Sequence, residues 1–161
     1  MKKHLLKYGI WAGIINITLG LTNWYTVAQA YGPSVSQPLG YLSMVAALLC
    51  IPFGIKYHRD QINSGVISFG QATSVGLGIA AVAAIITFLY SLIFFVFAGS
   101  DFITWQEKWL SPSELQAARE TMAQAPEFVS SGWFQALMLA ITGLVIGLII
   151  SLISAAALKK S

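Results

Sequence analysis

The chain has 161 residues, of which 57% are hydrophobic and 9% are charged, whereas about 25% of the residues of a soluble domain carry a charge. This composition excludes an ordinary soluble domain. The distribution of the net charge of +3 is more informative than its sum, and it gives no reason to expect a nucleic-acid partner.

Four apolar stretches contain no Asp, Glu, Lys or Arg: about residues 8–29, 39–55, 72–98 and 133–158. A helix of about 20 residues crosses the roughly 30 Å hydrocarbon core of a membrane. We therefore predict an all-α fold, a four-span transmembrane helical bundle. The longest gap between spans, 99–132, is too short for an independent core. Residues 1–161 are thus expected to form a single integral membrane domain.

Span one follows a basic start and ends in Trp24 and Tyr25, which is typical of an aromatic belt at the membrane interface. The same segment has features of a secretory signal, because Ala28-Gln29-Ala30 fits an A-x-A cleavage site. Its apolar part is longer than the roughly 7–15 residues of a signal peptide. We expect the segment to be retained as span one, and cleavage of residues 1–30 stays an open alternative.

Spans one and two are predicted to form an antiparallel hairpin, since Gly32-Pro33-Ser34 and Pro38 favour a tight connection between them. Span two is short, and Pro52 predicts a kink or an early helix end because proline lacks an N–H and crowds the preceding turn. Span three is long enough to tilt or protrude, and Gly99 could terminate it.

The segment 99–132 is expected to contain short amphipathic helices outside the membrane. Asp101 could cap one helix whose Phe102, Trp105 and Trp109 share a face lying in the interface. Ser111-Pro112-Ser113-Glu114 reads as a capping box, and the helix that it starts should end before Pro126. By default this helix is an amphipathic lid resting on the bundle, and the alternative is a binding site for a partner.

Small residues recur four apart within the spans and predict close helix contacts, because lipid offers no hydrophobic incentive for helices to associate. They are more often seams within a chain than dimer faces, although self-association remains an alternative. The asparagines of span one are seven apart, and we expect them to face a partner helix or the outer interface. The rows of small residues are Ala72, Gly76, Ala80 and Ala84; Gly143, Gly147, Ser151 and Ala155; and Gly9 and Gly13. The asparagines are Asn16 and Asn23.

Candidate chemistry is sparse. His58-Arg59-Asp60 matches the catalytic-loop tripeptide of protein kinases, but no other kinase motif is present. His4 and His58 are the two histidines, and neither has a second metal ligand at helical spacing. The lone Cys50 cannot form an intramolecular disulfide. No intramembrane charged residue marks an ion path. We expect no catalytic residues, no cofactor and no metal site, and no enzymatic activity.

Seven of the nine Lys and Arg residues lie before span one, between spans two and three, or after span four. The positive-inside rule therefore predicts that both termini and the loop 56–71 are cytoplasmic. Within that loop, Gly and Ser permit a bend and large apolar side chains avoid water. We predict a compact turn over 60–71 with Ile67 and Phe69 folded onto the bundle or the interface. The alternative is a plain linker in which this pair begins span three early.

Taken in order, several short motifs make the chain resemble a bacterial membrane family known as domain of unknown function 4199. The resemblance covers nearly the whole chain and implies a four-helix protein of the bacterial inner membrane, without an established activity or functional residues. The motifs are Lys7-Tyr8-Gly9, Ala12-Gly13, Gly40-Tyr41, Met44, Gly54-Ile55-Lys56, Arg59-Asp60, Gly65, Ile67-Ser68-Phe69-Gly70, Ala72, Gly76, Asp101-Phe102 and Gly147-Leu148-Ile149-Ile150-Ser151-Leu152-Ile153-Ser154-Ala155.

We expect a structural or interaction subunit of the cell envelope, with the lipid bilayer and another membrane protein as partners. The alternative is a small channel or transporter built by oligomerisation. Length and composition do not separate the two.

Overall fold

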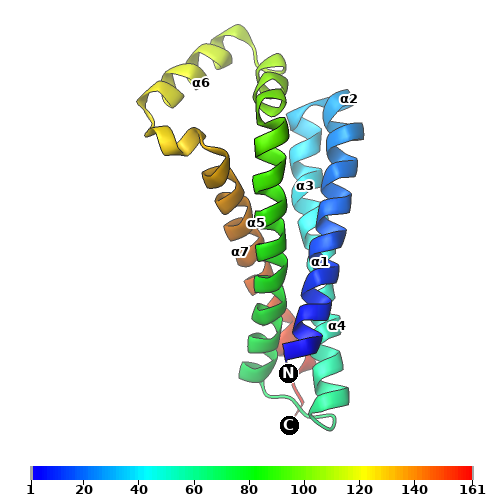
Figure 1. Cartoon of the computed structure of the whole chain (residues 1–161). Helices are drawn as coiled ribbons and strands as arrows, with labels where there is room; N and C mark the ends of the chain where they lie inside the picture. The colour runs from blue at the N-terminus through cyan, green and yellow to red at the C-terminus, as the bar shows by residue number, and fades with distance from the viewer. Residues whose placement is uncertain (1, 161) are drawn as a thin grey trace.

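The computed structural model describes residues 2–160, which form a bundle of four helical rods (Figure 1). All four rods are long and apolar enough to cross a membrane, which confirms the predicted all-α, four-span fold. The rods and their connection are α1 (Lys2–Thr22) with η1 (Asn23–Ala28) and α2 (Gln29–Tyr31); α3 (Pro33–Leu48) with α4 (Cys50–Tyr57) and η2 (His58–Ile62); α5 (Phe69–Lys108); α6 (Pro112–Gln124) with η3 (Glu127–Ser130); and α7 (Gly132–Leu158).

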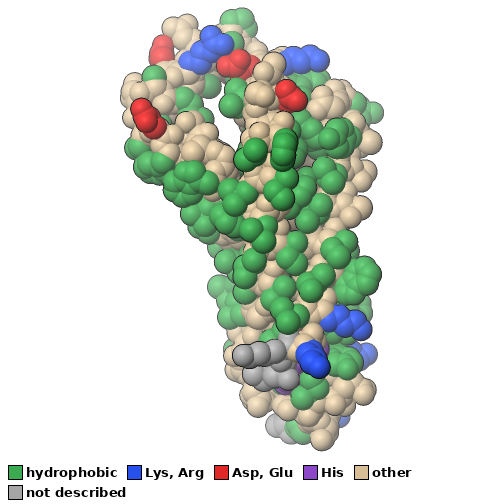
Figure 2. All heavy atoms as spheres, viewed as in Figure 1, with side chains coloured by type: hydrophobic (Ala, Val, Ile, Leu, Met, Phe, Trp, Pro, Cys, Tyr) green, Lys and Arg blue, Asp and Glu red, His purple; other side chains and the backbone are tan. Residues whose placement is uncertain are grey.

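Both ends of the described chain lie at one end of the bundle, and α6 projects at the other (Figure 1). We call these the terminal end and the arm end, and the segment 109–131 the arm. Hydrophobic side chains cover the middle of the visible face, and charged ones gather at its two ends (Figure 2). Large apolar side chains such as Ile85, Phe97 and Ile153 are 60%, 82% and 65% exposed. Exposed apolar surface on this scale suits lipid rather than water.

The second rod is longer than predicted. Gly32 takes a left-handed conformation with φ of 69° and Pro33 starts α3, whereas Pro38 lies inside the helix. The helix is interrupted where a kink was predicted, because Leu49 separates α3 from α4 three residues before Pro52. Proline has no N–H for the carbonyl one turn back, and its ring crowds that carbonyl. The predicted early end is wrong, since the rod continues through η2.

The prediction that Gly99 ends the third span is wrong. Helix α5 runs without interruption for 40 residues, about 60 Å at 1.5 Å per residue. Asp101 therefore caps no separate helix. Phe102 and Trp105 pack inward rather than along the interface: the Trp105 ring lies 5.1 Å from that of Trp24. A glycine in a helix interior costs about 1 kcal/mol, which burial of these aromatic rings outweighs.

Helix α6 begins with the predicted capping box and ends before Pro126, so both predictions are confirmed. Ser111 Oγ accepts from the Glu114 N–H, and the Ser111 N–H donates to the Glu114 carboxylate. The two bonds to Ser111, led by the one from its side chain, hold the pKa of Glu114 below its ordinary value of 4.5. The default prediction of a lid resting on the bundle is wrong, because α6 buries none of its residues and makes no extensive contact with the rods.

The rows of small residues form seams within the chain, as predicted. A Cβ at Gly147 would lie 2.6 Å from the Ala80 Cβ, which joins α7 to α5. A Cβ at Gly9 would lie 2.5 Å from the Val82 Cβ, which joins α1 to α5. Gly143 differs from the rest of its row, because a Cβ there would have no neighbour within 4 Å. The row on α7 is therefore in close contact with α5 at Gly147 but not at Gly143.

Candidate functional site

The two asparagines of span one hold its arm half to the neighbouring rods, as predicted. The Asn16 amide donates to Thr87 Oγ1 of α5 at 3.2 Å. The Asn23 amide donates to the Ser36 carbonyl oxygen of α3 at 2.8 Å. Because lipid supplies no hydrogen-bond partners, polar side chains in spans are satisfied by other helices. These bonds fix α1 and η1 relative to α3 and α5.

Between the rods, in this arm half, lies a cavity of about 440 Å³, within the roughly 300–1,000 Å³ typical of small-molecule sites. None of its described lining residues is charged. Aromatic rings make up much of the wall: Trp24, Tyr41, Tyr90, Phe94, Phe102 and Trp105. Uncharged polar side chains interrupt this wall, namely Asn16, Asn23, Ser36, Gln37, Ser43, Thr87, Ser91 and Gln135. We call this space the interhelical cavity.

One wall of the interhelical cavity carries an unsatisfied acceptor. Asn23 Oδ1 is buried and has no hydrogen-bond partner among the described residues. The amide orientation is set by the Ser36 carbonyl, which can only accept. A buried acceptor without a donor costs about 1–3 kcal/mol. Nearly all buried polar groups in folded proteins are paired, so this oxygen is an exception.

Toward the terminal end the interhelical cavity closes. It adjoins a void of about 20 Å³, which shares Asn16, Met44 and Thr87 with it and is otherwise walled largely by alanines. Beyond the void, the side chains of Ile51, Ile55 and Ile79 are fully buried. The space is therefore a blind pocket within one chain rather than a path through it.

The terminal end holds a second polar cluster, which we call the terminal clasp: His4, His58, Arg59, Asp60, Ile67, Leu158 and Lys160. His58 Nδ1 lies 3.0 Å from His4 Nε2, so one imidazole donates to the other. Both side chains are buried. No spacing along a single helix indicates this pair, because the two histidines are 54 residues apart. The one indication in the sequence is that both histidines lie at the predicted membrane edge where the basic residues gather.

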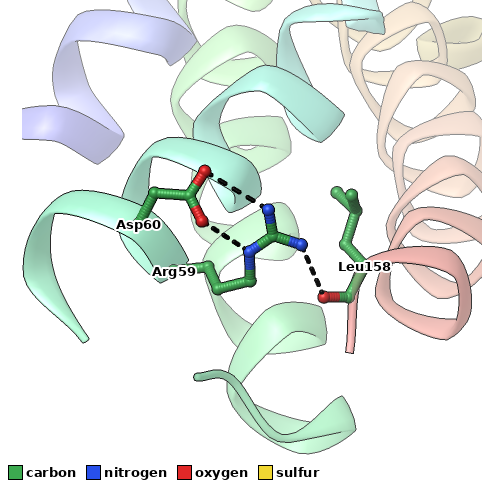
Figure 3. Close-up of polar contacts among 3 residues, drawn as sticks. All are labelled: Arg59, Asp60 and Leu158. Carbon is green, nitrogen blue, oxygen red and sulfur yellow. Dashed lines mark hydrogen bonds and ion pairs between the residues drawn. The ribbon is translucent and has the colours of Figure 1, made fainter. Parts of the chain in front are cut away.

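The other members of the terminal clasp fix the end of α7. Arg59 Nε donates to Asp60 Oδ1 at 2.6 Å, and Arg59 Nη1 donates to the Leu158 carbonyl oxygen at 3.3 Å (Figure 3). The last carbonyls of a helix lack intrahelical donors and carry partial negative charge, so an arginine is well suited there. The kinase-like tripeptide thus makes structural contacts between η2 and α7.

The loop before α5 completes the terminal clasp. Ser64 and Gly65 take positive φ angles of 53° and 89°, and the Gly65 N–H donates to the Arg59 carbonyl oxygen at 2.8 Å. The compact turn is confirmed. Ile67 is buried and pairs through two backbone hydrogen bonds with Lys160, as predicted for a side chain folded onto the bundle. Phe69, the first residue of α5, is 45% exposed and is not folded onto the bundle, which leaves the interface alternative of that prediction.

Among the described residues, no three His, Cys, Asp or Glu side chains gather closely enough to hold a metal ion. The histidine pair offers two nitrogens and the interhelical cavity offers none of these groups. The arrangement at the terminal end is therefore suited to joining elements, and the arrangement at the arm end to enclosing an uncharged molecule.

Comparison with protein families matches the chain to the family described as protein of unknown function (DUF4199), over residues 7–160. The chain belongs to this family. The match spans all four rods and confirms the resemblance noted in the sequence. No curated protein and no solved structure gives a match. The chain is therefore a member of DUF4199 with four apolar helices, compatible with a multi-pass membrane protein.

Proposed function

We propose that this protein is an integral interaction subunit of the bacterial inner membrane that binds a partner protein through the arm. The observation that carries the proposal is the isolation of α6. It is a capped helix, yet it buries no residue against the bundle. A short helix of this kind is marginal in isolation, so a surface supplied by a partner would give it the contacts that the chain does not.

The charge of the arm end indicates the chemistry of that partner. The arm, 109–131, holds three carboxylates and one basic side chain, and both signs are visible on it (Figure 2). The exposed Arg119–Glu107 ion pair, 3.3 Å between Nη2 and Oε1, ties α6 to α5, but exposed pairs contribute little to stability. The net negative arm fits a basic protein surface next to the membrane.

The partner can be tested by photo-crosslinking in intact cells. A photoreactive residue at Leu115 should give one protein adduct, with a basic surface outside the membrane. Reversing two charges with Glu120→Lys and Glu127→Lys should abolish the adduct, and the neutral pair Glu120→Gln and Glu127→Gln should weaken it. The same photoreactive residue at Ile85, which is 60% exposed on the lipid-facing side of α5, serves as the control. Adducts with lipid alone, or an adduct insensitive to charge reversal, would contradict the proposal.

A channel or transporter built by several copies is the alternative, and flux separates it from the interaction subunit. The buried isoleucines that close the interhelical cavity favour the interaction subunit for a single chain. Purified protein in lipid vesicles should therefore give no ion or solute flux above that of empty vesicles. Flux that grows with protein density would support the alternative.

The proposed orientation places the terminal end in the cytoplasm, because seven of nine Lys and Arg residues flank that end. Reporters fused after Ser161 or within 60–66 should read cytoplasmic, and a reporter near Gln116 should read periplasmic. A cytoplasmic reading at Gln116 would refute this topology. Mature protein whose N-terminal sequence begins at Tyr31 would show instead that the first segment is a cleaved signal.

A further inference from the structure

The interhelical cavity has a lining that selects its occupant by chemistry. It is large enough for a single-chain or ring-bearing molecule. Burying an ion without a counter-charge is strongly unfavourable, and the described lining offers no charge of either sign. The aromatic walls of η1 and α5 favour an apolar body instead.

Hydrogen-bonding groups lie at both ends of this aromatic section. Asn16 and Thr87 stand where the cavity adjoins the small void, and the Asn16 amide is already engaged by Thr87, which leaves the Asn16 carbonyl oxygen as an acceptor. Gln37, near the start of α3, is exposed and also lines the cavity. The Asn16 carbonyl oxygen and the Gln37 amide suit a molecule that brings a hydroxyl or amide N–H.

We propose that the interhelical cavity binds an uncharged amphipathic molecule drawn from the membrane, with a hydroxyl or amide end and a single apolar chain or ring system. The apolar body lies against Trp24 and Trp105, and the polar end meets the amide groups. This inference does not depend on the arm or on the proposed partner.

Two glycines provide a matched pair of variants. A Cβ at Gly20, which lines the cavity, has no neighbour within 4 Å, so Gly20→Leu extends into free space and reduces the cavity without displacing backbone. Gly70 lies in the first turn of α5 at the terminal end, and a Cβ there is also free of neighbours. Both substitutions replace a helical glycine by a better helix former, so neither is expected to unfold the chain.

The probe is 9,10-dibromostearyl alcohol, whose bromines quench nearby tryptophans, titrated into phosphatidylcholine nanodiscs that hold the full chain. The chain carries Trp11→Phe, Trp109→Phe and Trp133→Phe, so that the emission comes from Trp24 and Trp105. We expect saturable quenching at low probe fractions. Gly20→Leu should weaken the apparent affinity about tenfold, whereas Gly70→Leu should leave it unchanged.

A second titration tests whether the uncharged cavity excludes a charged molecule. The carboxylate analogue, 9,10-dibromostearate, should quench at neutral pH only in proportion to its fraction in the bilayer, without saturation. Quenching by the alcohol that is linear in probe fraction, or equal saturation by alcohol and carboxylate, or equal affinity of Gly20→Leu and the parent chain, would overturn the proposal.

Discussion

Gly147→Leu is expected to destabilise the folded bundle more than any other single substitution considered for α7. The Cβ that leucine adds would lie 2.6 Å from the Ala80 Cβ and 3.7 Å from the Ala80 Cα. A methyl group on a helix backbone cannot rotate away, so α5 and α7 must separate along their seam. Overpacking of this kind costs about 1–3 kcal/mol and occasionally more, which outweighs the roughly 1 kcal/mol gained by removing a helical glycine.

The control for this substitution lies one turn away on the same helix. Gly143→Leu makes the same chemical change where a Cβ has no neighbour within 4 Å, and Leu148→Val changes a side chain that is 38% exposed. Unfolding of the three variants by titration with a denaturing detergent, followed by circular dichroism, gives their free energies of unfolding. Equal losses for Gly147→Leu and Gly143→Leu would show that the α5–α7 seam is not packed as described.

The second large effect is expected at the histidine pair of the terminal clasp. Replacing His58 by leucine leaves the His4 imidazole buried without its partner, which costs about 1–3 kcal/mol. His4→Leu should cost a similar amount for the same reason. The double variant should recover part of the loss, because two apolar side chains in contact leave no unsatisfied nitrogen between them.

A double-mutant cycle measures this coupling, which for residues in one hydrogen-bond network is about 0.5–3 kcal/mol. Lys7→Leu is the control, since Lys7 is exposed on the same helix and at the same end as His4. Its effect should be small and additive with that of His58→Leu. If the effects of His4→Leu and His58→Leu are themselves additive, the two imidazoles do not interact in the folded protein.

Partner binding by the arm and ligand binding in the interhelical cavity are expected to be independent of each other. Charge reversal in the arm should leave binding of the brominated alcohol unchanged, because the arm contributes no described residue to the cavity lining. In the same way, Gly20→Leu should leave the partner adduct intact. Each proposal can therefore fail without affecting the other.

The sequence by itself determined the features that depend on local pattern. Hydropathy over about 20 residues predicted the four spans, because the bilayer requires a continuous apolar helix. The box at Ser111 and Glu114 predicted the start of α6, because capping involves residues three apart. The four-residue spacing of Gly147, Ser151 and Ala155 predicted one face of α7, because positions four apart lie together on a helix.

Only the tertiary structure decided which apolar faces meet. In a membrane, residues that face lipid and residues that face another helix can be equally hydrophobic, so hydropathy does not reveal that Trp105 packs on Trp24 and carries α5 through Gly99. The contact between His4 and His58 depends on the register of two rods. The interhelical cavity depends on how four rods spread apart above a seam of small residues. The isolation of α6 depends on its apolar face, which is too weak to hold the helix on the bundle. These are relations between distant segments, which no local pattern encodes.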